Sequence, residues 1–200
     1  MVGPSTSSRL PAAERRRQLL DVALEQFGSK GFHHTSMNDV AEAAGVTKPV
    51  LYQHFSSKRS LYLELLREVG QRLRDQVAKA TVEADGPRQQ VEAGFGAYFT
   101  WVAGNRGGFE ILFAGETRRD IEFVREAMAV ETQIADAIAS LIVVDGLSEE
   151  RRRLLAYGIV GIAETTCRHW MVSDLDLGAK QLAAQVSELA WAGLRGLRPG

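Results

Sequence analysis

The chain has 200 residues, 45% of them hydrophobic and 24% charged, which is the composition of a globular protein with enough apolar material for a packed core. It has one cysteine, a polar N-terminal segment unlike a signal peptide and no apolar run of about eighteen residues, so we expect a cytoplasmic protein without disulfide bonds or a membrane partner. Although the net charge is −1, basic residues outnumber acidic ones twelve to eight up to Ala80 and trail them twelve to seventeen beyond it, so a polyanion suits the front half only.

Helical spacing of apolar residues recurs along the chain and strand-like alternation is absent, so we predict an all-α fold. Residues 1–11 are small and polar and should form a disordered tail. The first helix should run from about Pro11 to Ser29, and Gly28 and Gly31 should close it. Its apolar stripe comprises Leu19, Leu20, Ala23, Leu24 and Phe27.

Two short helices should follow, joined by a sharp turn. Ser36, with Asp39 three residues later, is typical of a capping box at the start of a helix that ends near Ala44. Gly45 should adopt the left-handed conformation that a side chain would resist. Thr47 should cap the next helix, in whose first turn Pro49 is tolerated. This pattern indicates a helix-turn-helix.

The helix after Gly45 should have two chemically different faces. Its apolar face comprises Val50, Leu51, His54 and Phe55. Its polar face comprises Lys48, Pro49, Tyr52 and Gln53. A cation, a phenol and an amide suit the phosphates and base edges of DNA, although a merely solvated helix face is the plainer alternative.

Longer helices should fill the rest of the chain. The first carries apolar residues at strict four-residue spacing: Leu61, Leu65, Val69, Leu73 and Val77. Asp85-Gly86-Pro87 should end it. Further helices are expected at about Arg88–Ala103, Phe109–Ala114, Arg119–Val143, Ser148–Val172 and Ala179–Leu194. The expected breaks between them are Asn105-Arg106-Gly107-Gly108, Gly115, Asp145-Gly146 and residues 173–178.

The helix-turn-helix region resembles the DNA-binding signature of the TetR family at many points. The matching residues are Phe27-Gly28-Ser29-Lys30-Gly31-Phe32, Thr35, Val40-Ala41, Ala44-Gly45-Val46-Thr47, Leu51-Tyr52-Gln53-His54-Phe55 and Lys58. The resemblance covers the first quarter to third of the chain. It implies a three-helix DNA-binding head at residues 12–60, linked by a fourth helix to a ligand-binding and dimerisation domain at residues 61–200.

The resemblance also implies individual DNA contacts. Thr35 and Ser36 match phosphate contacts at the start of the second helix. Positions that read bases in the family are matched by Thr47, Lys48, Pro49 and Gln53. A phosphate-contacting aromatic pair is matched by Tyr52 and His54, and a phosphate clamp by Lys58. His54 as a packed core residue stays an alternative, and the Arg15-Arg16-Arg17 run suits either a solvated helix start or phosphate contact. Arg59 departs from the family, which often has an acid there.

A family member of this kind needs an internal, mostly apolar cavity. The candidate lining residues are Phe95, Phe99, Phe109, Phe113, Phe123 and Trp170, for most of which core packing is the default explanation. The segment Gly45 to Lys58, together with Ala190-Trp191-Ala192-Gly193-Leu194, further resembles actinobacterial regulators of fatty-acid synthesis. That resemblance implies an apolar effector such as a long-chain acyl-CoA.

The family resemblance also implies a homodimer joined through the last two long helices. The candidate interface residues are Leu155, Ile159, Ile162, Thr166, Val186 and Leu189, with burial inside the same chain as the alternative for about half of them. Gly158 and Gly161 would permit close helix approach.

Enzyme chemistry finds little support in the sequence. Cys167 and His169 are two residues apart on an expected helix and point in different directions, so they cannot pair as nucleophile and base. We expect no catalytic residue, metal site or cofactor. We therefore predict a ligand-responsive regulator, repressor or activator, that binds a palindromic operator in double-stranded DNA. A helical carrier of small molecules or lipids, or an enzyme with an apolar substrate, would be the alternatives.

Overall fold

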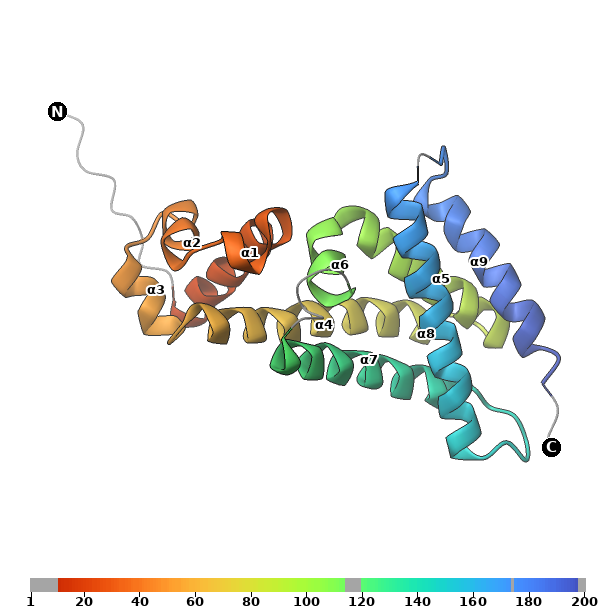
Figure 1. The fold of residues 1–200 in the computed structure, drawn as a ribbon. Coiled ribbons are helices and arrows are strands. Elements are labelled where there is room, and N and C mark those ends of the chain that lie inside the picture. The colour runs from red at the N-terminus through yellow and green to blue at the C-terminus, as the bar shows by residue number, and fades with distance from the viewer. Residues whose placement is uncertain (1–10, 114–119, 174, 198–200) are drawn as a thin grey trace. The chain divides into compact units, whose positions relative to one another are not determined.

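The computed structural model describes residues 11–113, 120–173 and 175–197, and within these ranges the regular elements are all helices (Figure 1). The prediction of an all-α fold is confirmed. The expected tail lies outside the described residues except for Pro11, and so do the expected helix end at Ala114, the break at Gly115 and the helix start at Arg119. None of the helices in the described part of the chain combines the length and hydropathy that a bilayer crossing requires.

The chain divides into two compact units, Met1–Leu65 and Leu66–Gly200. The division falls inside α4 (Lys58–Val82), which is continuous across it, whereas the sequence led us to expect a boundary at residue 60. The helix therefore belongs to both units. The two units are described in turn.

The N-terminal unit consists of α1 (Ala12–His34), α2 (Met37–Ala43), α3 (Lys48–His54) and the start of α4. α2 packs on both α1 and α3. The core comprises Leu19, Leu20, Ala23, Phe27, Met37, Val40, Ala41, Leu51, Phe55, Leu61, Tyr62 and Leu65, each at most 5% exposed. The Tyr62 ring meets the Phe27 ring edge-on, with 5.2 Å between ring centroids. One apolar face of each short helix is thus enough to hold the unit together.

Local hydrogen bonds fix the turns of the N-terminal unit, and those at Ser36 and Gly45 were predicted from the sequence. Ser36 caps α2, its Oγ accepting from the Asp39 N–H at 3.2 Å while Asp39 Oδ2 accepts from the Ser36 N–H at 2.7 Å. Gly45 has a φ of 64°, so the left-handed turn is present. Ser57 and Ser60 form a second reciprocal pair at the start of α4, each N–H donating to the other hydroxyl at 3.0 Å.

α1 extends further than predicted. It continues past Ser29 to His34, with one non-helical residue inside it, Gly31, at φ 79° and ψ 166°. The extra turn is closed by Thr35, whose hydroxyl donates to the carbonyls of Gly31 at 2.9 Å and Gln26 at 3.2 Å. Gly31 therefore kinks the element where we expected it to end.

In its described residues, the C-terminal unit contains the rest of α4 and five further helices. They are α5 (Pro87–Gly104), α6 (Arg106–Phe113), α7 (Ile121–Leu141), α8 (Glu149–Val172) and α9 (Ala179–Leu194). α5 packs against α9, and α7 packs against α8, which crosses it at a steep angle (Figure 1). The break at Asp85-Gly86-Pro87 is confirmed, because Gly86 lies between α4 and α5 with a φ of 87°.

One expected break is wrong. Gly107 and Gly108 lie inside α6 rather than in a loop before it. A Cβ atom on Gly108 would lie 2.9 Å from the Trp101 ring and 3.3 Å from the Val69 side chain. This glycine therefore permits close packing of α6 on α5 and α4, and it does not end a helix.

Candidate functional site

α3 exposes a polar face and buries an apolar one. Leu51 is fully buried and Phe55 is buried just after the helix, whereas Lys48, Pro49 and Gln53 are exposed. The Tyr52 side chain is 44% exposed. The polar groups therefore face away from the N-terminal unit, as the three- and four-residue spacing predicted, and are free to donate hydrogen bonds to another molecule.

Arg16 fixes the end of α3. Its Nη1 donates to the His54 carbonyl at 2.7 Å, its Nε donates to Glu64 Oε1 at 2.7 Å, and its guanidinium lies 4.5 Å from the centroid of the Phe55 ring. One side chain thus connects α1, the end of α3 and α4. Within the Arg15-Arg16-Arg17 run, Arg16 is therefore engaged inside the protein. Residue spacing could not predict this role, because Glu64 is 48 positions away from Arg16.

Several candidate DNA-contacting residues line one open hollow of the N-terminal unit. The hollow is bordered by His33, His34, Thr35, Ser36, Met37, Asn38, Lys48, Tyr52 and Lys58. It brings together the start of α2, the polar face of α3 and the start of α4. His33, His34 and Asn38 were not among the candidates. The one sequence feature that could have indicated them is their position between Gly31 and the turn of the helix-turn-helix.

The polar groups around this hollow are partly used inside the protein. Thr35 is buried and its hydroxyl donates to main-chain carbonyls, so that hydroxyl is not available to a phosphate while these bonds last. Ser36 Oγ donates to Asp39 Oδ2 at 2.6 Å. The Lys58 ammonium donates to the carbonyls of Phe32 at 2.7 Å and Thr35 at 2.9 Å, which leaves one of its three N–H groups for a phosphate. Lys58 therefore holds the α1–α2 connection in addition to carrying charge.

The remaining candidates differ in exposure. Thr47 is exposed and its hydroxyl makes no cap hydrogen bond to α3. His54 is half-buried, and its ring lies 6.3 Å from the Phe55 ring, centroid to centroid. Both the packed reading and the DNA-contact reading of His54 are compatible with this position.

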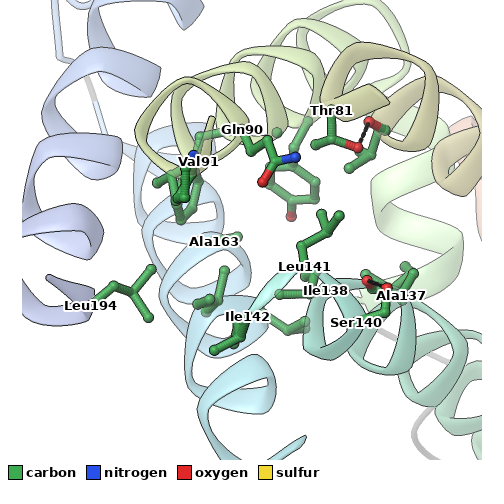
Figure 2. A pocket seen from close by; sticks show the side chains of 18 of the residues that line it. Thr81, Gln90, Val91, Ala137, Ile138, Ser140, Leu141, Ile142, Ala163 and Leu194 are labelled. Atoms are coloured by element: carbon green, nitrogen blue, oxygen red, sulfur yellow. Dashed lines mark hydrogen bonds between the residues drawn. The ribbon is translucent and has the colours of Figure 1, made fainter. Parts of the chain in front are cut away.

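The C-terminal unit contains an apolar cavity of about 520 Å³. Figure 2 shows Gln90 and Val91 of α5 facing Ile138, Leu141 and Ile142 at the end of α7 across this space. Side chains from the second half of α4, from α8 and α9, and Phe113 of α6 complete the wall. The volume lies within the range of about 300–1,000 Å³ that is usual for small-molecule sites.

The six aromatic candidates separate into two groups. Phe95 and Phe113 line the cavity. Phe99, Phe109 and Phe123 are at most 2% exposed in the core, and the Trp170 indole N–H donates to the Leu177 carbonyl at 2.8 Å; these four are not among the described lining residues. The sequence analysis missed most of the wall, which is aliphatic. Its signal was the spacing of Ile134, Ile138 and Leu141 along α7.

One polar group on the cavity wall is buried without an oxygen or nitrogen partner. Tyr98 is 9% exposed, and among the described residues only the Cys167 sulfur, a weak acceptor, lies beside its hydroxyl. Burial raises the pKa of Tyr98 well above its usual value, so the hydroxyl stays protonated at neutral pH. Burial likewise raises the pKa of the neighbouring Cys167 thiol to about 12, which makes this thiol unreactive.

The candidate interface residues of α8 and α9 also differ in exposure. Val186 is 5% exposed, so little of its side chain is left for an interface, and Leu155 and Ile159 pack against a cluster inside the unit. Ile162 and Thr166 are half-buried, whereas Leu189 is 66% exposed. The exposed face of α8 carries apolar residues that the sequence analysis did not select, among them Leu154, which is 72% exposed, and Val172.

Within the described residues, no group of three or more His, Cys, Asp or Glu side chains could hold a metal ion. Cys167 lies buried beside Tyr98, while the His169 ring lies 3.2 Å from Ser173 Oγ. The two features that stand out are the polar face of α3 and the apolar cavity.

Known proteins share both halves of this chain. Residues 19–65 match the family model of bacterial regulatory proteins of the tetR family, and residues 87–193 match the tetracyclin repressor-like C-terminal domain. The HTH-type transcriptional activator FasR of Mycolicibacterium smegmatis is 34% identical over 96% of this chain and 88% of its own length.

Two solved structures have the same fold. A TetR-like transcriptional regulator from Rhodococcus sp. RHA1 aligns with a TM-score of 0.73 and 27% identity, covering 94% of this chain and 100% of that one. The transcriptional regulator FadR from Bacillus subtilis, crystallised with stearoyl-CoA, aligns with a TM-score of 0.76 and 19% identity, covering 91% and 99% of the two chains. The chain therefore belongs to the TetR family of helix-turn-helix transcription regulators.

Proposed function

We propose that two copies of this protein bind the two halves of a palindromic operator through α3, and that an acyl-CoA in the cavity changes the affinity for DNA. The observation that carries the DNA-binding half is the outward polar face of α3, formed by Lys48, Tyr52 and Gln53 over a buried Leu51. A regulator of this kind acts in the cytoplasm, where its operator is.

Side-chain chemistry separates the residues of the N-terminal unit that would contact bases from those that would contact phosphates. The Gln53 amide can donate to and accept from adenine, and Lys48 can reach guanine acceptors or a phosphate. Tyr52, Lys48 and the remaining N–H of Lys58 border one hollow, where a phosphate oxygen would meet several donors. Phosphate contacts would supply most of the affinity and make it fall with salt concentration.

The cavity supports an apolar effector. Its wall is mainly aliphatic and aromatic, and its volume of about 520 Å³ suits a hydrocarbon chain better than a whole coenzyme. The Bacillus subtilis FadR structure, which has the same fold, contains stearoyl-CoA. A fatty acyl chain is therefore the first effector to test.

The exposed face of α8 supports dimerisation. Gly158 and Gly161 lie on the same exposed face as Leu154, and a Cβ atom on either glycine would meet nothing within 4 Å in the protomer. Together with Leu189 of α9, this face offers apolar surface and room for a close helix approach. The proposed interface is thus centred on the two glycines, and Val186 does not belong to it.

α4 supports the coupling between the effector and DNA. It supplies Leu73 and Val77 to the cavity wall and is continuous to Lys58. A ligand shifts DNA affinity only by the difference in its own affinity for the DNA-competent and other states. Movement of α4 is the route we propose for that difference.

Operator recognition can be tested with DNA from upstream of the protein's own gene. The wild type should shift this DNA, and palmitoyl-CoA should change the affinity. Gln53→Ala should lose about 1–3 kcal/mol of discrimination at one base pair in each half-site. Gln76→Ala, which removes an exposed amide from α4 outside the N-terminal unit, should behave as the wild type.

The outcomes separate the alternatives. An equal loss of affinity on every sequence would show that Gln53 does not read a base. Ligand binding without any DNA shift would favour the carrier function instead. A DNA shift that palmitoyl-CoA leaves unchanged would retain the DNA-binding half of the proposal and reject the acyl-CoA effector.

A further inference from the structure

Among the described residues of the cavity wall, one hydrogen-bonding atom is buried without an oxygen or nitrogen partner, whereas the polar side chains of Gln90 and Arg195 on the same wall are not buried. Of its polar side chains, Thr81 donates to the main-chain carbonyls of Val77 and Ala78 at 3.1 and 3.0 Å, and Ser140 donates to the Ala137 carbonyl at 2.7 Å. Arg74 and Glu164 are engaged by side chains outside the cavity, Gln133 and Arg168 respectively. The hydroxyl of Tyr98, by contrast, is buried and has no oxygen or nitrogen partner among the described residues.

An unpaired buried hydroxyl is costly, because it gives up water without gaining another partner. The neighbouring Cys167 thiol does not remove this cost, because sulfur is a weak acceptor. Phe99 meets the Tyr98 ring edge-on at 5.2 Å between centroids and helps to hold it in place. Tyr98 is therefore held in position, with a hydroxyl that lacks a strong acceptor, at the surface of a mainly apolar cavity.

We infer that the Tyr98 hydroxyl selects effectors by donating a hydrogen bond to a neutral oxygen on the buried part of the ligand. This inference rests on the proposed acyl effector and names the group that recognises it. A neutral oxygen is favoured over a carboxylate because Glu164 also lines the cavity and its negative charge acts on the Tyr98 hydroxyl. A second negative charge at Tyr98 would have to share Arg168 with Glu164.

Two ligand oxygens have the required chemistry. The wall includes the exposed side chains of Val82 and Val143, while Tyr98 is buried eleven residues along α5 from Pro87, about 16 Å at the rise of an α-helix. A chain that enters from Val82 and Val143 with its methyl end first would bring its far end to Tyr98. A chain in the opposite direction would bring its acyl carbonyl there.

Two matched ligand pairs distinguish these oxygens. Hexadecanoyl-CoA and its thioether, hexadecyl-CoA, differ only in the acyl carbonyl. Hexadecanoyl-CoA and 16-hydroxyhexadecanoyl-CoA differ only in a hydroxyl at the chain end. In calorimetric titrations, the wild type should bind the member of one pair that carries the additional oxygen with about tenfold higher affinity. Tyr98→Phe should abolish that difference in affinity.

Thr81→Val is the matched control in the same cavity. It removes a hydroxyl that already donates to main-chain carbonyls, so any change in affinity should be equal within each pair. The ligand-free stability provides a second readout. Tyr98→Phe removes an unpaired buried hydroxyl and should raise the melting temperature without ligand, whereas a structural hydrogen bond would give the opposite sign.

Each contrary result has a defined meaning. Equal binding within both pairs, a preference that survives Tyr98→Phe, or a lower melting temperature of the ligand-free variant would overturn the inference and leave the acyl-CoA effector standing. Failure of the wild type to bind any of the three ligands would reject the acyl-CoA effector itself, and the role of Tyr98 would fall with it.

Discussion

The two units of this protein place their binding groups in opposite ways. The N-terminal unit buries the apolar face of α3 and turns Lys48, Tyr52 and Gln53 outward, so its chemistry lies on the surface of one seven-residue helix. The C-terminal unit assembles its cavity from side chains between Leu73 and Leu197, contributed by six helices and the segments beside them. A surface site of the first kind depends on local spacing, whereas an internal site of the second kind depends on how distant helices pack.

We expect the C-terminal unit to bind its partner protomer through a surface, the exposed face of α8. Gly161→Glu places a charge on the proposed dimer face, where the protomer itself has room for it. Loss of the dimer should lower operator affinity by about a hundredfold or more, because one chain would then hold only one half-site. Light scattering coupled to size exclusion should report a change from twice the 22.0 kDa chain mass to the chain mass.

Thr100→Glu is the control for this change, since it adds the same charge to an exposed position of α5. It should leave both mass and DNA affinity as in the wild type. If the Gly161→Glu protein stays dimeric, the interface lies elsewhere. The internal cavity would then be the one binding site proposed for the C-terminal unit.

Close packing of α4 on α7 should contribute more to the free energy of unfolding than any single surface group of the N-terminal unit. A Cβ atom on Gly70 would lie 2.5 and 2.6 Å from the two γ-methyl groups of Val130, so rotating that side chain gives no relief. Gly70→Ala should therefore lower the free energy of unfolding by about 1–3 kcal/mol, as overpacking does. Urea denaturation measures this.

Gly96→Ala is the matched control, because a Cβ atom there would meet nothing within 4 Å. This substitution in α5 should raise stability by up to about 1 kcal/mol through helix propensity alone. If both variants were stabilised to the same degree, the contact between α4 and α7 would be loose, and α4 would be a poor route for coupling.

The smallest change in stability should come from a substitution on the surface of the N-terminal unit. Hydrogen bonds from the Ser36 hydroxyl and N–H hold the pKa of Asp39 below its usual 3.8, with Lys30 and Lys58 adding to the shift. A lowered folded-state pKa stabilises the protein above the unfolded value, and this contribution is lost as the pH falls through the folded value.

Asp39→Asn should therefore lower the melting temperature slightly at pH 7. The difference from the wild type should narrow below pH 3.8, where the wild-type carboxylate takes up its proton. Asp75→Asn, at an exposed position of α4, serves as the comparison. A difference that stays constant with pH would assign the effect to helix capping geometry and not to charge.

The sequence predicted what depends on near neighbours. The Ser36–Asp39 cap, the turn at Gly45 and the two faces of α3 each involve residues at most a few positions apart, and all are present. Arg16 and Lys58 could not be assigned in this way, because their partners lie up to 48 and 26 positions away.

The cavity shows the same limit in the C-terminal unit. Phe95 and Phe99 are one helical turn apart on α5, yet only Phe95 is among the described residues that line the cavity, because the Phe99 ring is buried edge-on against Trp170 of α8, 6.5 Å away between centroids. Gly107 and Gly108 read as a loop, although Gly108 is a close helix contact. Which face of a buried helix meets a cavity is decided by its neighbours in space, and spacing along one helix does not contain that information.

The burial of Cys167 has a practical consequence for spectroscopy. It is the chain's single cysteine, and its thiol has a pKa of about 12, so almost none of it is thiolate at neutral pH. Maleimide dyes or nitroxide labels should therefore react with an introduced cysteine, for example at exposed Asn38, against little background. In the proposed dimer, the distance between the labels on the two N-terminal units could then be recorded with and without effector, while the native cysteine beside Tyr98 is left in place.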